Sequence, residues 1–180
     1  MRRRESGRIA LCGVMGALAI VVMLMGSIIP IATFCAPLIS SVLMMTVAIE
    51  FGAKTGLLLY LAVALLALLL VPDREMAMIF TFFLGYYPVL KFYLERLRPA
   101  PLRLLAKLIV FNGAILAMYS ILLYLFPMQA LVDEFSGMGH GFVLLLLAMG
   151  NVAFLLYDRA LVGVSYLYRA RFRPMLAHFL

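Results

Sequence analysis

The chain has 180 residues, of which 67% are hydrophobic, and carries a formal net charge of +7. Soluble globular proteins are nearer half apolar, so this composition excludes an ordinary water-soluble domain. The basic residues stand at the ends of long apolar runs, where they orient membrane spans, so the positive charge does not indicate nucleic-acid binding.

Six apolar segments follow one another and predict an all-α polytopic membrane protein with six transmembrane helices in a single integral membrane domain. The first segment follows MRRRESGR and is too long for the apolar core of a typical signal peptide, so we interpret it as a retained helix. The expected helices are about 9–29, 37–50, 55–71, 76–97, 102–126 and 141–168. Cys12 and Cys35 flank the first helix, roughly 30 Å apart, which is too far for a disulfide.

Two places along the chain predict irregular backbone. The first outer connection, PIATFCAP at 30–37, has a proline at each end and almost no charge. We expect a loop there that folds back on the protein or dips into the membrane. Gly85 and Pro88 interrupt the fourth span and predict a kink. Lys91 follows one turn later, and we expect it to snorkel or to pair with Glu95 at i+4.

The charges set the orientation of the spans. Of the fifteen Lys and Arg, all but Arg74 fall on one side of the six-helix arrangement. The positive-inside rule makes that side cytoplasmic and places both termini there. We therefore expect a multi-pass protein of a plasma membrane, of bacterial type. The longest outer loop, at 127–141, carries Asp133, Glu134 and His140.

The motifs of common enzyme classes are missing from the sequence. It has no HExxH, no GxSxG and no Cys/His metal spacing, and GAKTG at 52–56 lacks the spacing of a P-loop. Few charged residues are expected to converge inside the membrane. We therefore predict that the chain is not an enzyme and uses no metal or cofactor.

Polar residues inside the spans are the candidate functional groups, because burying them in a bilayer is costly. Asn112 and Asn151 lie near mid-span on neighbouring helices, and either bond each other or face a ligand. Asp158 and Arg159 point about 100° apart on their helix, and we expect them to pair with other helices or to reach the inner interface.

Aromatic residues gather in the outer halves of the fourth and fifth spans. They form either the wall of an outward cavity or an interfacial aromatic belt. The candidate substrate-binding residues are Thr33, Phe34, Glu75, Thr81, Phe82, Asn112, Tyr119, His140 and Asn151. The candidate partner interface is the small-residue face of the first span, where a second helix from this chain or from a partner can approach closely. It consists of Gly13, Gly16 and Ala17.

Six short helices in 180 residues, an Arg-rich start, a Pro-bounded loop after the first helix and no ATPase motif together resemble the substrate-binding S components of energy-coupling factor (ECF) transporters. Members often carry Ala-x-x-x-Ala in the first helix, where Gly13 to Ala17 is a small-residue variant. The resemblance implies capture of a small vitamin-like or precursor molecule from outside, in a pocket formed by the fourth to sixth helices and the first outer loop.

The resemblance also implies partners, namely a transmembrane coupling subunit and two cytoplasmic ATPases, in addition to the lipid bilayer and the small-molecule substrate. No nucleic acid is expected as a partner. An alternative function stays open. The small-residue face of the first span also suits a non-transporting scaffold or interaction subunit of an envelope-building complex.

Overall fold

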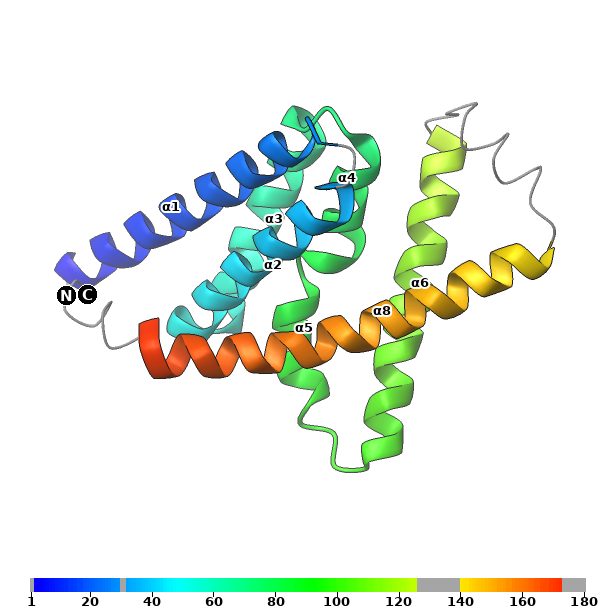
Figure 1. The fold of residues 1–180 in the computed structure, drawn as a ribbon. Coiled ribbons are helices and arrows are strands. Elements are labelled where there is room, and N and C mark those ends of the chain that lie inside the picture. Colours follow the sequence, from blue (N-terminus) through cyan, green and yellow to red (C-terminus); the bar gives the residue numbers. More distant parts are fainter. Residues whose placement is uncertain (1, 30–31, 126–139, 173–180) are drawn as a thin grey trace.

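The computed structural model describes residues 2–29, 32–125 and 140–172, and these residues form helices and short turns without a strand (Figure 1). The predicted outer loop at 127–141 falls almost wholly outside them. Six helical stretches are long and apolar enough to cross a membrane, which confirms the prediction of an all-α polytopic protein. They are Glu5–Gly26, Ala32–Phe51, Ala53–Leu70, Arg74–Leu94, Ala100–Ile121 and Leu144–Arg171.

The first three helices pack closely on one another. They are α1 (Arg2–Gly26), α2 (Ala32–Phe51) and α3 (Ala53–Leu70). Ser40 in α2 donates a hydrogen bond to the carbonyl oxygen of Ala19 in α1 at 3.0 Å, and both residues are fully buried. At the crossing of α2 and α3, a Cβ added to Gly56 would lie 2.7 Å from the Cβ of Ala48. Small residues thus let the helices approach closely.

The prediction of an irregular connection over 30–37 is wrong for most of that range, because α2 begins at Ala32 and contains Pro37. Pro37 removes only one helical hydrogen bond near the start of the helix, and transmembrane helices tolerate such a loss where neighbouring groups compensate. Ala36 and Pro37 are buried. Thr33 donates to Asp73 Oδ2 at 3.0 Å, which ties the start of α2 to the start of the fourth span.

The fourth span is broken into three pieces, α4 (Arg74–Ile79), the π-helical η1 (Phe80–Leu84) and α5 (Tyr87–Leu94). In η1, Gly85 N donates to the carbonyl oxygen of Phe80 at 2.7 Å, one residue further back than in an α-helix. The Thr81 carbonyl would accept that bond in an α-helix, and here it accepts the hydroxyl of Tyr60 at 2.6 Å.

The predicted irregularity of the fourth span is therefore present, but it precedes Pro88. Pro88 stands at the start of α5, where a proline without an N–H costs no helical hydrogen bond. The break is made by the π-helical turn and Gly85, and Pro88 begins the helix that follows it.

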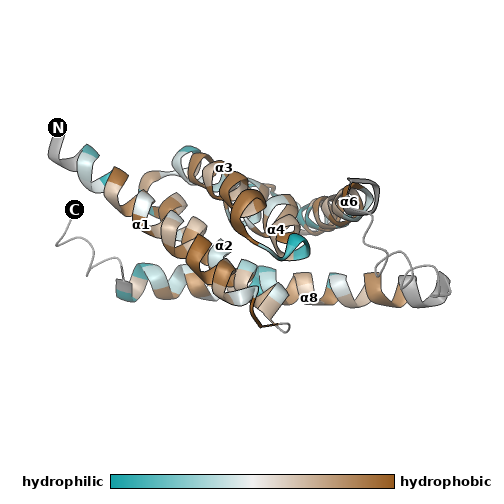
Figure 2. Cartoon of the chain, turned by 90° about the horizontal axis from the view of Figure 1, so that it is seen from above, coloured by the Kyte–Doolittle hydropathy of each residue, from teal (hydrophilic) through white to brown (hydrophobic). Residues whose placement is uncertain are grey.

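The last two long helices, α6 (Ala100–Leu125) and α8 (His140–Leu167), cross each other steeply instead of running side by side (Figure 1). The five-residue π-helix η2 (Tyr168–Phe172) ends the described chain. Both long helices expose large apolar side chains, including Ile109, Leu116, Leu144 and Leu156. Brown, apolar segments recur along α8 in the ribbon of Figure 2, where they alternate with pale and teal ones. Such surfaces require a lipid environment, as expected for membrane spans.

Candidate functional site

An apolar cavity of about 610 Å³ lies where α2, η1, α6 and α8 meet. Among the described residues, no charged side chain lines it. Its most prominent lining groups are the aromatic side chains Phe34, Phe83, Phe111, Tyr119, Phe154 and Tyr157. A mostly apolar concave site with a few polar groups is the usual form of a small-molecule site.

The aromatic wall of the cavity is closely packed. The rings of Phe111 and Phe154 stack with centroids 4.8 Å apart and planes inclined by 4°. Phe83 meets both rings edge-on, at 5.1 Å and 5.4 Å. Stacked and edge-to-face pairs stabilise one another beyond their buried area, so these rings hold fixed positions. The wall is therefore a preformed cluster of packed rings from η1, α6 and α8.

Two hydroxyl groups supply the polar points of the lining. Tyr119 donates to Glu75 Oε1 at 3.1 Å, and the hydroxyls of Tyr157 and Ser41 lie 2.8 Å apart. Both tyrosine hydroxyls therefore have a protein partner. Ser41 donates to the Leu38 carbonyl oxygen, so Tyr157 is the donor to Ser41, and its oxygen can still accept a bond from a ligand.

The predicted substrate-binding residues separate into groups. Phe34 and Tyr119 line the cavity, and Glu75 reaches it through Tyr119. Thr33 bonds Asp73, and Phe82 packs at the edge of the hydrophobic core.

Thr81 is not among the described residues that line the cavity, and for His140 only the backbone is described. Within the described part of the chain, Thr81 Oγ1 is buried without a hydrogen-bond partner. His140 begins α8, and its side chain lies outside the description.

Asn112 and Asn151 bond each other where α6 and α8 cross. Asn112 Nδ2 donates to Asn151 Oδ1 at 2.9 Å, and Asn151 Nδ2 donates to Asn112 Oδ1 at 3.1 Å. Each amide also donates to the carbonyl oxygen four residues back, at 2.8 Å. Of the two roles left open by the sequence, the structure shows the helix-to-helix bond. The pair fixes the position of α8 beside the cavity.

Replacing Asn112 and Asn151 by Leu, singly and together, is expected to show a coupling free energy of about 0.6–1.7 kcal/mol, the range for hydrogen bonds between membrane helices. Either single change leaves an amide without its partner, whereas the double change removes both amides. Reversible unfolding in mixed micelles measures this double-mutant cycle. Additive losses from the two single variants would show that the pair does not hold α6 to α8.

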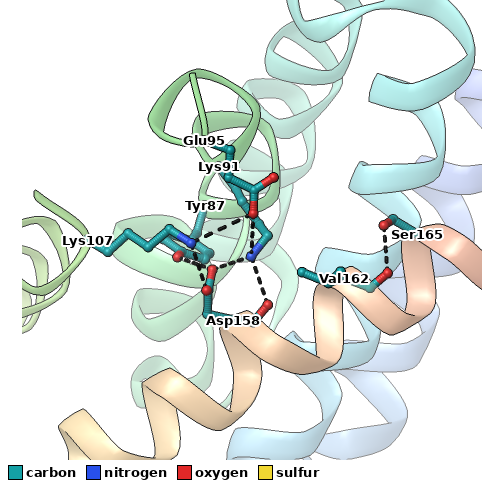
Figure 3. A network of polar contacts seen from close by, with 7 residues as sticks. All are labelled: Tyr87, Lys91, Glu95, Lys107, Asp158, Val162 and Ser165. Atoms are coloured by element: carbon teal, nitrogen blue, oxygen red, sulfur yellow. Dashed lines mark hydrogen bonds and ion pairs between the residues drawn. The ribbon is translucent and has the colours of Figure 1, made fainter. Parts of the chain in front are cut away.

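A charge cluster, consisting of Lys91, Glu95, Lys107 and Asp158, joins α5, α6 and α8 (Figure 3). Lys91 and Lys107 are each only 5% exposed. Lys107 Nζ lies 2.7 Å from Asp158 Oδ2, and Lys91 contacts Asp158 Oδ1. Tyr87 donates to the same carboxylate at 2.7 Å. Two cations thus face two anions, and the cluster is neutral overall.

The cluster confirms two predictions and corrects a third. Lys91 pairs with Glu95 at 3.1 Å, and Asp158 pairs with other helices, as expected. The expectation that few charged residues converge within the spans is wrong. Lys107 is the residue from which the charge cluster could have been predicted, because a lysine inside an apolar span requires a partner. Asp158 follows Tyr157 directly, so α8 connects the charge cluster to the cavity.

One part of the candidate partner interface packs inside the protein, and the other part borders an open groove. Gly16 is buried against α3, where an added Cβ would lie 3.1 Å from Leu59 and 3.4 Å from Val63. Gly13 and Ala17 are exposed and line a groove of about 740 Å³ between α1 and α3. Only part of the small-residue face is therefore used within the chain.

Comparison with known protein families, with curated proteins and with solved structures finds no match for this chain.

Proposed function

We propose that the chain is the membrane-embedded substrate-capture subunit of an ECF-type uptake transporter for a small vitamin-like or precursor molecule. The observation that carries the proposal is the aromatic cavity of about 610 Å³ between α2, η1, α6 and α8. Its position among the later helices and the start of α2 agrees with the region that the resemblance to S components implies. Phe34 and Tyr119, selected from the sequence as substrate-binding residues, both line it.

The capture subunit of such a transporter must associate with a coupling subunit. The groove of about 740 Å³ between α1 and α3 supports this part of the proposal, because Gly13 and Ala17 leave room for a helix from another protein. Binding of the substrate and docking of the partner then use different residues of the fold. In this arrangement the chain itself performs no chemical reaction.

Isolation of the tagged chain from its native membrane tests the proposal. We expect a transmembrane coupling subunit and cytoplasmic ATPases to co-purify, and to be lost when Gly13 and Ala17 are both replaced by Leu. The matched control is Gly113→Leu on α6, where an added Cβ meets no described atom within 4 Å. Purification of the chain without any ATPase, under conditions that keep membrane complexes intact, would contradict the transporter assignment.

The same groove favours a second candidate, a non-transporting scaffold subunit of an envelope-building complex. Photo-crosslinking from position 13 or position 17 separates the two. Capture of a coupling subunit bound to ATPases supports the transporter subunit, and capture of cell-wall machinery supports the scaffold.

A further inference from the structure

We infer that the cavity takes an uncharged, lipophilic, ring-containing molecule, and that this molecule reaches the site from within the bilayer. The inference rests on the proposed capture function and names the class of its ligand. Three observations carry it, namely the chemistry of the lining, the commitment of the nearby charges and the exposure of the cavity rim.

The lining offers no counter-charge to an ionised ligand. Among the described residues, it contains aromatic, aliphatic and Met side chains, Gly150, and the two hydroxyls of Tyr119 and Tyr157. Burying an ionised group without a partner costs far more than burying an apolar one. A ligand with a carboxylate, phosphate or ammonium group therefore pays a penalty that an uncharged ligand avoids.

The charged groups closest to the cavity already have partners within the protein. Asp158 directly follows Tyr157, and its carboxylate contacts Lys91, Lys107 and Tyr87. Glu75 accepts a hydrogen bond from Tyr119 at the other end of the cavity. Recruiting one of these groups to a charged ligand would require breaking an existing contact in a largely buried region, which is expensive.

The geometry of the wall favours a flat ring. Phe111 and Phe154 are nearly parallel, and Phe83 stands edge-on to both. An aromatic ligand can extend this arrangement by offset stacking or by an edge-to-face contact. The Tyr157 hydroxyl proton is used by Ser41, so its oxygen suits a hydroxyl group on the ligand that donates to it.

The rim of the cavity lies on surfaces that face the bilayer. Phe34, Leu116 and Met149 all line the cavity and are 57%, 63% and 62% exposed. They belong to α2, α6 and α8, inside three of the candidate membrane spans. An opening bordered by exposed apolar side chains within the spans gives access from hydrocarbon. A lipophilic molecule already dissolved in the membrane can use it directly.

The absence of Trp from the sequence provides a clean spectroscopic test. In Leu116→Trp, reconstituted in vesicles, the introduced indole at the rim is the only Trp. We expect phospholipids with brominated acyl chains to quench its emission and aqueous iodide to leave it unchanged. Strong quenching by iodide with none by the brominated chains would place the rim in water and overturn the proposed route.

Ligand class is tested in the same variant with two fluorescent probes, N-phenylnaphthylamine and anilinonaphthalene sulfonate. They share one ring skeleton and differ by a sulfonate. Energy transfer from the introduced Trp is expected to saturate with the uncharged probe, and the sulfonate is expected to weaken binding by about tenfold or more. Adding Gly150→Leu, which places a side chain in the cavity beside Phe111, should abolish the saturable component, whereas Gly163→Leu on the same helix should retain it.

The outcomes distinguish the ligand class from the function. Equal binding of both probes, sensitive to Gly150→Leu, would overturn the uncharged class and leave the cavity as a capture site. Saturable transfer that persists in Gly150→Leu, or none from either probe, would overturn the inference. The proposed function would then still be decided by co-purification of the ATPase subunits, which does not depend on the probes.

Discussion

Replacing Asp158 by Asn is expected to destabilise the protein by about 3–5 kcal/mol, the usual loss when one partner of a buried ion pair is removed. The change keeps the size of the side chain and still accepts a hydrogen bond from Tyr87. It leaves Lys91 and Lys107, each 5% exposed, with Glu95, whose side chain is 41% exposed. Two ammonium groups would then share one partly solvated carboxylate. Thermal unfolding in detergent micelles measures the loss.

Two comparison variants separate the charge cluster from a general effect of altering α8. Arg159→Gln changes an exposed neighbour of Asp158 and should be nearly neutral. Adding Lys107→Met to Asp158→Asn removes one of the uncompensated cations and should recover part of the stability. If Asp158→Asn unfolds at the wild-type temperature, the cluster does not hold α5, α6 and α8 together.

Replacing Gly85 by Ala is expected to cost about 1–3 kcal/mol, as overpacking in a close-packed interior does. The added Cβ would lie 2.6 Å and 2.8 Å from two ring atoms of Tyr60 and 2.9 Å from the carbonyl oxygen of Phe80. The Tyr60 ring is held by its hydrogen bond to the Thr81 carbonyl, so it cannot move aside without losing that bond. The change therefore disturbs η1, which forms one wall of the cavity.

Gly113→Ala on α6 provides the matched control, because a Cβ there meets no described atom within 4 Å. Alanine is the better helix former, so this variant should be unchanged or stabilised by up to about 1 kcal/mol. Opposite signs for the two Gly→Ala changes are the expected result. A stability gain in Gly85→Ala would show that the contact with Tyr60 does not constrain the π-helical turn.

Hydropathy and local residue spacing predicted most of the fold. The six spans follow from the apolar runs, the irregularity near Gly85 from Gly and Pro, and the Lys91–Glu95 pair from i+4 spacing, all of which are local properties. The start of α2 could not be predicted in this way, because a proline such as Pro37 usually indicates that a helix is interrupted. In this protein the buried packing of Ala36 and the Thr33–Asp73 bond support the helix instead.

The cavity and the charge cluster depend on contacts between helices distant in sequence. Phe83, Phe111 and Phe154 come from three spans, and no spacing within one span indicates that their rings meet. Lys107 and Asp158 are likewise 51 residues apart. The steep crossing of α6 and α8 decides these contacts, and hydropathy carries no information about crossing angles.

The cavity as a ligand site is tested most directly by ligand-induced stabilisation of purified protein in lipid nanodiscs. Thermal unfolding is followed in the wild type, Gly150→Leu and Gly163→Leu against a panel of vitamins and their lipophilic precursors. At least one compound is expected, at a hundred times its Kd, to stabilise the wild type and Gly163→Leu by about 2.7 kcal/mol. That compound should leave Gly150→Leu unchanged, because a leucine at position 150 narrows the cavity beside Phe111. Stabilisation of all three proteins to the same degree, or of none by any compound, would show that the cavity is not the ligand site.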